Sequence, residues 1–247
     1  MKVVPIKTHK ISPQNHSLFK ILNKYLSSMD ENSVLAVTSK IVSICEGRIM
    51  KTGKIDKDIL IRREAEYYLP KSKSQYGFIL TIKNGLLMPS AGIDESNANG
   101  HYIFHPANSQ KTANQIRRYL KKRFSIKKVG VIITDSRTVP LRWGTTGVAL
   151  AHSGFSALNS YIGIPDIFGR KLKVTKANIM DGLAATAVLV MGEGKEQTPL
   201  VLISDIPFVK FKNSDPSDKE LAGLKIDRST DLFAPLLTSV RWLKDKP

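Results

Sequence analysis

Cysteine is almost absent from this chain, which has one, Cys45, among 247 residues. A single cysteine excludes an intramolecular disulfide framework and fits a reducing compartment, so we expect a cytoplasmic protein in which Cys45 is a packed thiol. Long hydrophobic runs are missing too, since no stretch approaches the roughly 20 apolar residues that a membrane-spanning helix needs. The opening MKVVPIKTHK lacks the apolar region and cleavage site of a signal peptide. We therefore expect no membrane partner.

Acidic residues are scarce relative to basic ones. The chain has 21 Asp and Glu against 38 Lys and Arg, a formal net charge of +17. Such a chain attracts polyanions, or small substrates rich in phosphate and carboxylate. The one dense basic cluster, residues 117–128, carries Ile116, Leu120 and Phe124 at helical spacing, so we interpret its cations as a solvated helix face. The sequence lacks zinc-finger spacing, RNA-binding strand signatures and a helix-turn-helix, and we do not expect nucleic acid as a partner.

Apolar, β-branched segments alternate with helical periodicities, which predicts an α+β or α/β architecture. Strands are expected over residues 1–7, 34–38, 127–135 and 198–204, and a hairpin over 76–93. In that hairpin, Asn84-Gly85 is typical of a tight turn. Helices are expected over residues 16–29, 63–69, 108–124, 173–194 and 232–243. The small-residue stretch 145–158 predicts segments that pack closely.

Two acidic stretches raise the question of function. The predicted strand in VGVIITDSRT ends at Asp135 and Ser136, and SAGIDESNANG carries Asp94 three residues before Asn97. Such side chains cap turns and helices by accepting backbone hydrogen bonds. Oxygen donors of this kind also bind Mg²⁺ or Mn²⁺, and the residues alone leave both interpretations open. Glu193, in VMGEGKEQTP, has the same ambiguity, between two glycines that would let the backbone approach a phosphate.

Six motifs together resemble one family. They are TSKIVSICEGR, SAGIDESN, VGVIITDS, LRWGTTGVALAHSGF, IGIPDIFGRKLKVT, and DGLAATAVLVMGEG followed by TPLVLI. They occur in the order found in the coenzyme F420-0:γ-glutamyl ligase family. The resemblance covers most of residues 1–205 and implies an α+β, two-lobed, mixed-sheet body that forms a homodimer. We place the two interleaved lobes of this body in residues 1–210, and a basic tail in residues 211–247 with a final helix packed on the body.

The resemblance also implies a reaction. Enzymes of the family use GTP and Mg²⁺ or Mn²⁺ to join L-glutamate to the carboxylate of a phosphorylated flavin-like cofactor. A carboxylate does not react with an amine at neutral pH, because its leaving group would be oxide. We therefore expect γ-phosphoryl transfer from GTP or ATP to give an acyl phosphate, which the glutamate amine then attacks. Nucleotide, glutamate and acceptor are all anions, which suits the basic charge of the chain.

Site residues follow from the resemblance by position. Metal binding is implied for Asp94, Asp135, Ser136 and Glu193. Arg142 would add fixed positive charge as a catalytic residue. Nucleotide-binding positions are Ile11, Ser39, Lys40, Asn97, Met191, Gly192, Gly194 and Lys195.

Three positions depart from the family pattern. Ile44 replaces a lysine, Thr138-Val139 replaces a Gly-Arg pair, and Gly182 replaces the second acid of an Asp-Glu pair. Arg137 is close enough to compensate for the lost arginine. Loss of a fixed cation weakens binding of an acceptor phosphate, so we predict a changed acceptor preference, with a folate as the first alternative. A second alternative, from another class, is a non-catalytic basic nucleic-acid-binding or scaffold protein of the same fold.

Overall fold

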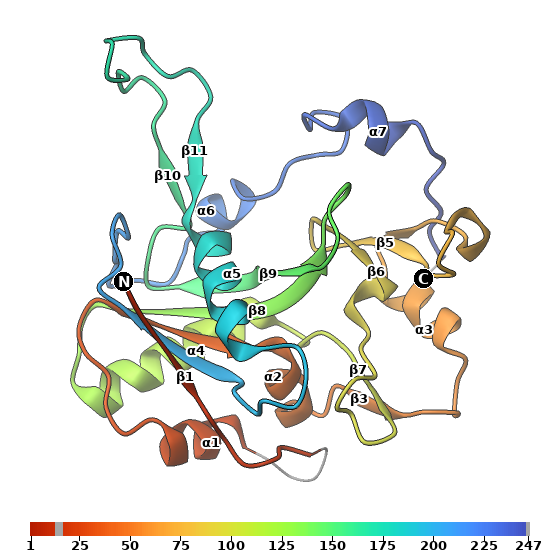
Figure 1. Cartoon of the computed structure of the whole chain (residues 1–247), viewed down its shortest axis with the longest axis horizontal. Helices are drawn as coiled ribbons and strands as arrows, with labels where there is room; N and C mark the ends of the chain where they lie inside the picture. Colours follow the sequence, from red (N-terminus) through yellow and green to blue (C-terminus); the bar gives the residue numbers. More distant parts are fainter. Residues whose placement is uncertain (13–16, 246–247) are drawn as a thin grey trace. The chain divides into compact units, whose positions relative to one another are not determined.

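The computed structural model describes residues 1–12 and 17–245, and the chain forms two compact units (Figure 1). The first unit consists of Met1–Glu46 and Pro106–Pro216, and the second of Gly47–His105 and Ser217–Pro247. Each unit is thus built from two separate stretches of sequence. The predicted division into a body of residues 1–210 and a tail of residues 211–247 stays a prediction. His16, the first residue of a predicted helix, lies outside the described residues.

The first unit is built on a five-stranded mixed sheet, which confirms the predicted α+β class. Its strand order is β1-β12-β2-β8-β9. The strands are β1 (Lys2–Ile6), β12 (Leu200–Ser204), β2 (Ser33–Thr38), β8 (Val129–Thr138) and β9 (Thr145–Ser153). Only β2 and β8 pair in parallel within this sheet, and the other neighbours are antiparallel. A central strand covered on both faces needs a continuous apolar run, which the segment SVLAVT of β2 supplies.

Helices cover both faces of this sheet (Figure 1). One face packs against α1 (Leu18–Tyr25), α2 (Ser39–Cys45) and α4 (Ser109–Phe124), and the other against α5 (Ile179–Met191). The period-two alternation of strand side chains divides the core accordingly. Leu35 and Val37 of β2 join the cluster under α1, α2 and α4, whereas Val34 and Ala36 join the cluster under α5.

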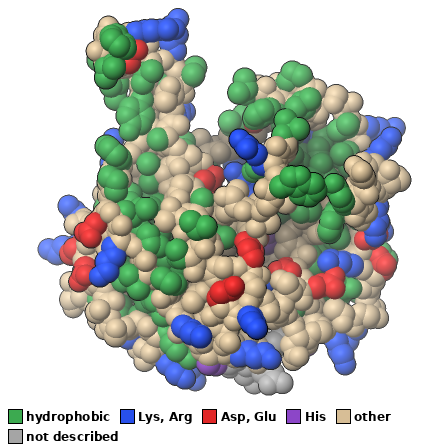
Figure 2. Space-filling model, in the orientation of Figure 1, with side chains coloured by type: hydrophobic (Ala, Val, Ile, Leu, Met, Phe, Trp, Pro, Cys, Tyr) green, Lys and Arg blue, Asp and Glu red, His purple; other side chains and the backbone are tan. Residues whose placement is uncertain are grey.

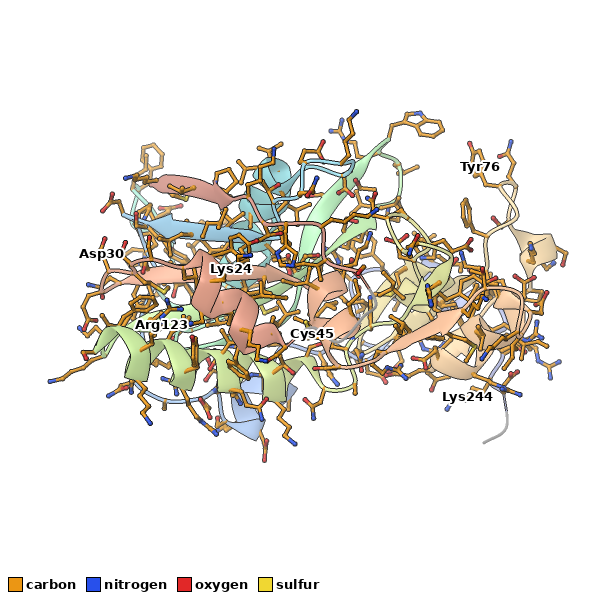
Figure 3. All side chains as sticks on the ribbon, turned by 90° about the horizontal axis from the view of Figure 1, so that it is seen from below. Lys24, Asp30, Cys45, Tyr76, Arg123 and Lys244 are labelled. Atoms are coloured by element: carbon orange, nitrogen blue, oxygen red, sulfur yellow. The ribbon has the colours of Figure 1, made fainter. Side chains whose placement is uncertain are left out.

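Two arginines of the basic cluster are structural. Arg117 is 4% exposed, and its Nη2 donates to Asp215 Oδ1 at 2.6 Å. Arg123 donates to the carbonyls of Leu22 at 2.8 Å and Leu26 at 2.6 Å, so it satisfies acceptors at the end of α1 (Figure 3). The apolar face of α4 is confirmed. The interpretation of the cluster as a solvated face is wrong for these two residues, because their partners lie on other segments.

The second unit contains smaller sheets around its own core. The strands β3 (Ile49–Lys51) and β7 (His101–Ile103) form one sheet, and β4 (Tyr67–Tyr68), β5 (Leu80–Lys83) and β6 (Leu86–Pro89) form another. The helices are α3 (Lys57–Glu64), α6 (Asp218–Ala222) and α7 (Ala234–Thr238), with short 3-10 turns at Lys71–Lys73 and Ser90–Gly92. The predicted hairpin is confirmed, with Asn84 at φ 53° and Gly85 at φ 75° as its turn requires.

The helix predicted over residues 63–69 is wrong. The helix α3 ends at Glu64, and Ala65 is already extended at ψ 140°. The aromatic residues Tyr67 and Tyr68 instead pair with β5, since aromatic side chains suit a pleated surface. Pro70 also restricts the residue before it to extended backbone. The predicted final helix is present only as the five residues of α7.

A hairpin arm projects from the first unit (Figure 1). Its base is the pair β10 (Leu158–Ser160) and β11 (Lys176–Asn178). Strand β11 also corrects the predicted helix over residues 173–194, because α5 begins only at Ile179. Backbone hydrogen bonds from Gly163 to Leu172 and from Asp166 to Arg170 continue the arm outward. Among the described residues, no helix combines the length and the apolar character required to cross a bilayer.

Candidate active site

Asp135 and Ser136 lie inside a strand, so the prediction that the strand ends at them is wrong. Strand β8 continues to Thr138, with Asp135 opposite Val148 and Ser136 opposite Gly147. The strand persists because β9 pairs with it across this region. Both side chains are half-buried, and Asp135 Oδ1 accepts a hydrogen bond from the backbone N–H of Ser136 at 2.9 Å. The pair is therefore held on a sheet strand, which fixes it more firmly than a loop would.

Close packing of α5 on β9 fixes this part of the sheet. A Cβ at Gly147 would lie 2.3 Å from the carbonyl oxygen of Ala184, so only glycine allows this approach. A Cβ at Gly154 would lie 2.1 Å from the carbonyl oxygen of Val129. The predicted close packing of the small-residue stretch is confirmed at both glycines.

Glu193 lies in the loop that follows α5. The helix ends at Met191, and Gly192, at φ 74°, turns the chain. Glu193 is exposed, and its Oε1 accepts a hydrogen bond from Thr145 Oγ1 at 3.2 Å. Thr145 begins β9, the strand that pairs with the one carrying Asp135. No sequence pattern indicated a role for Thr145, because its contact joins residues 48 positions apart.

Three segments with predicted nucleotide-binding residues meet in the first unit. The N–H of Thr8 donates to Gln197 O at 2.8 Å, which places the segment of Ile11 beside the loop after α5. The N–H of Thr38 donates to Pro199 O at 3.0 Å, so the start of α2 adjoins the same loop. These segments carry Ile11, Ser39, Lys40, Met191, Gly192, Gly194 and Lys195. Their roles in nucleotide binding stay predictions.

Asp94 and Asn97 belong to the second unit. The backbone of Asp94 exchanges hydrogen bonds of 2.9 and 2.8 Å with Ile103. Its Oδ1 accepts from the N–H of Ser96 at 2.7 Å and its Oδ2 from Ser96 Oγ at 2.9 Å. Asn97 is exposed at φ 54°. Asp94 thus organises a local turn. Metal binding by Asp94 stays a prediction.

The remaining singled-out positions have distinct environments. Arg142 is exposed in the turn between β8 and β9, and its catalytic role stays a prediction. Ile44 is buried in α2, so packing explains an apolar residue there. A Cβ at Gly182 would meet no atom within 4 Å, so packing does not require this glycine. Cys45 packs against the core under α1, α2 and α4, which confirms a packed thiol. Burial, followed by the charge of Glu46, raises the pKa of this thiol to about 11.

Asp181 anchors the start of α5 to the sheet. Its Oδ1 accepts from the N–H of Ala149 at 2.9 Å, and its Oδ2 accepts from Asn178 Nδ2 at 2.8 Å. The Nη2 of Arg137, on β8, lies 3.9 Å from the same Oδ2. The side chain of Arg137 is 29% exposed, while its Nε is buried and makes no hydrogen bond to any residue that the structure describes. Both oxygens of Asp181 therefore accept hydrogen bonds, and Arg137 is only loosely paired with this carboxylate.

The donor atoms fit a hard divalent cation in chemical type. Asp135, Ser136 and Glu193 in the first unit, and Asp94 in the second, offer carboxylate and hydroxyl oxygens, the ligands that Mg²⁺ and Mn²⁺ prefer. Within either unit, the described residues form no group of three or more His, Cys, Asp or Glu side chains that could hold a metal by itself. Mg²⁺ suits such a sparse set, since it keeps several waters and binds substrate phosphates.

Known proteins resemble this chain over most of its length. The F420-0:Gamma-glutamyl ligase family matches residues 5–205. The coenzyme F420:L-glutamate ligase of Methanococcus maripaludis strain C6 is 35% identical over 241 residues, which cover 91% of this chain and 95% of the relative. The enzyme of that name from Methanopyrus kandleri is 35% identical over 71% of this chain and 76% of its own. The enzyme of that name from Methanocaldococcus jannaschii is 34% identical over 76% of this chain and 82% of its own length. The chain therefore belongs to the F420-0:gamma-glutamyl ligase family, a family of amide-bond-forming ligases.

Proposed function

We propose that this protein joins L-glutamate to the carboxylate of F420-0 in a reaction that depends on a metal ion and a nucleotide. One observation carries the proposal. Thr145 holds Glu193 against the sheet that displays Asp135 and Ser136, and the loop of Glu193 also contacts the segments at Thr8 and Thr38. The candidate metal-binding and nucleotide-binding segments of the first unit thus adjoin one another. The relatives reported above are named coenzyme F420:L-glutamate ligases.

The proposed chemistry proceeds in two steps. An acceptor carboxylate oxygen attacks the γ-phosphorus of GTP or ATP, and the bond to the β-phosphate oxygen breaks, giving an acyl phosphate and a nucleoside diphosphate. The glutamate amine then attacks the acyl carbon, loses a proton, and expels phosphate. Asp94, Asp135, Ser136 and Glu193 would hold Mg²⁺ or Mn²⁺, which supplies charge neutralisation at the phosphate oxygens. Arg142 would add a fixed cation for a carboxylate or phosphate.

We further propose that the protein is a homodimer, and the hairpin arm supports this. Ile167 and Phe168 near its tip are 90% and 89% exposed, and Val174 is 83% exposed. Figure 2 shows hydrophobic side chains gathered on the projecting arm together with basic ones. Monomers rarely expose several large apolar residues in one place without a partner. A second copy would cover them.

A folate is the second candidate acceptor. The open space at Gly182 favours this alternative, because packing does not account for the absence of an acidic side chain there. Ile44 stands where the family resemblance implies a lysine at a nucleotide-binding position, and a site with one fixed cation fewer would favour a folate, which carries carboxylates but no phosphate.

The experiment supplies F420-0 and a reduced folate separately, with L-glutamate, GTP or ATP, and Mg²⁺ or Mn²⁺, and identifies glutamylated products by mass spectrometry. Glutamyl-F420-0 as the main product supports the leading proposal. A glutamylated folate as the main product supports the alternative proposal, in which the same reaction uses a folate as the acceptor. The absence of both products under every nucleotide and metal combination would contradict ligase activity on these acceptors and favour the non-catalytic alternative.

A further inference from the structure

Arg137 presents hydrogen-bond donors that the protein does not use. Its side chain makes no hydrogen bond among the described residues, and its nearest acid, Asp181, lies 3.9 Å away. That carboxylate already accepts from Ala149 and Asn178. A guanidinium has five N–H donors in a planar fork. Asp181 thus lies near one end of the guanidinium group but too far away to accept a hydrogen bond from it.

The free-energy cost of an unpaired buried N–H on Arg137 indicates that a bound ligand supplies a hydrogen-bond acceptor. The Nε of Arg137 is shielded from solvent and has no hydrogen-bond partner among residues 1–12 and 17–245. A buried N–H without an acceptor costs roughly 1–3 kcal/mol, and native proteins rarely leave one unpaired. The structural Arg123 shows the contrast, since it donates to the carbonyls of Leu22, Asn23 and Leu26. Arg117 also has one buried unpaired nitrogen, Nη1, but its Nη2 and Nε donate to Asp215.

The position of Arg137 defines the ligand chemistry. It follows Asp135 and Ser136 directly on β8, and the opposite residue on β9 is Thr146. The guanidinium fork matches the paired oxygens of a carboxylate or phosphate. We propose that Arg137 binds an oxyanion of a substrate, a phosphate or a carboxylate, beside Asp135 and Ser136. This inference rests on the proposed ligase function and adds a substrate-binding residue to it.

The test compares the full-length protein with Arg137→Gln and Arg137→Lys. Arg241→Gln is the matched control, since it removes the same charge from an exposed residue of the second unit. The apparent KM is measured separately for nucleotide, L-glutamate and F420-0, alongside the thermal unfolding midpoint. In parallel, calorimetry measures binding of GTP with Mg²⁺, of L-glutamate and of F420-0 without turnover.

We expect Arg137→Gln to raise the KM for one substrate by about ten- to a hundred-fold, with the other two nearly unchanged. Arg137→Lys should recover part of this loss, because it keeps the charge but not the fork. The substrate whose KM rises distinguishes a nucleotide phosphate from an acceptor or glutamate group. If all three KM values stay unchanged, or if the variant only lowers kcat and the unfolding midpoint, Arg137 merely supports Asp181 and the proposal is wrong.

The calorimetric measurements separate this proposal from the ligase proposal. If the wild-type protein makes no product, the ligase proposal is wrong, but the binding measurements still test the role of Arg137. Weaker binding of one anion to Arg137→Gln than to Arg241→Gln still supports the oxyanion role. Equal binding of every anion to Arg137→Gln and Arg241→Gln, or no binding of any anion to the wild-type protein, overturns it.

Discussion

At the scale of single residues, carboxylates of this chain have contrasting environments. Asp215 accepts from Arg117 Nη2 at 2.6 Å and also pairs with Arg118, which fastens residues 211–216 to α4. Burial acts to raise the pKa of Asp215, but hydrogen bonds from the two arginines outweigh it and hold the pKa below its usual value. The carboxylate of Asp135 accepts a local backbone hydrogen bond from Ser136. The arrangement at Asp215 stabilises the fold, whereas metal binding by Asp135 is a proposal that a substitution can test.

Asp215→Asn should lower the free energy of unfolding at neutral pH by about 2–3 kcal/mol, because it leaves the buried Arg117 without a counter-charge. The stability from Asp215 is present above its unfolded pKa of 3.8. It is lost as the pH falls through the lower folded value. Urea unfolding between pH 7 and pH 2 measures the effect.

The control for this measurement is Asp30→Asn, which removes the same charge from an exposed residue (Figure 3). A difference between wild type and Asp215→Asn that stays constant down to pH 2 would show that the ionised carboxylate is not the source of the stability.

Asp135→Asn should weaken Mn²⁺ or Mg²⁺ binding and abolish ligation, because the proposed metal site would lose one negative charge. The near-isosteric amide keeps an acceptor for the N–H of Ser136, so the thermal unfolding midpoint should stay close to that of wild type. Metal titration by calorimetry and the ligation assay check both expectations. Undiminished turnover at saturating Mg²⁺ would rule out a metal role for Asp135.

At the scale of elements, the sequence predicted those with strong periodicity. Strand β2 was recognisable because burial on both faces requires a continuous apolar run. Helix α4 was recognisable because burial on one face places its apolar residues at helical spacing. Strand β9 was not predicted, because glycine and alanine have low strand propensity and its identity comes from pairing with β8. The contact of Thr145 with Glu193 could not be predicted from the sequence either, because only tertiary packing brings the two residues together.

Gly147→Ala should destabilise the protein by roughly 1–3 kcal/mol, because its Cβ would collide with the backbone of α5 at Ala184. Gly182→Ala is the matched control on α5 itself. Its Cβ would meet no neighbour, so the change should stabilise the helix by about 0.5–1 kcal/mol. Chemical denaturation of both variants measures the difference, and equal effects of the two substitutions would refute the close approach of α5 to β9.

At the scale of the whole molecule, the candidate ligands come from both compact units. Asp94 and Asn97 belong to the second, whereas Asp135, Ser136 and Glu193 belong to the first. The family resemblance predicted these residues as ligands from the sequence. It could not show that the N-terminal segment and the start of α2 both bind the loop after α5, since those bonds join residues 189 and 161 positions apart.

Phe168→Asp should convert the proposed homodimer into monomers, because a charge at the tip of the arm cannot be buried against a second copy without a partner. Leu189→Asp, on the exposed face of α5, is the control and should leave the assembly unchanged, since Leu189 is 82% exposed but lies off the arm. Analytical ultracentrifugation gives the masses. A wild-type protein that is monomeric at every concentration would contradict the dimer.

The central claim is that nucleotide cleavage drives amide formation in this protein. The most direct measurement is the ratio of nucleoside diphosphate released to glutamyl product formed by the wild-type protein with F420-0, L-glutamate, GTP or ATP, and Mg²⁺ or Mn²⁺. The proposed acyl-phosphate route predicts one diphosphate per amide bond, with no amide when nucleotide or metal is left out. Amide formation that proceeds without nucleotide, or nucleotide cleavage that yields no amide with either F420-0 or a folate, would contradict it.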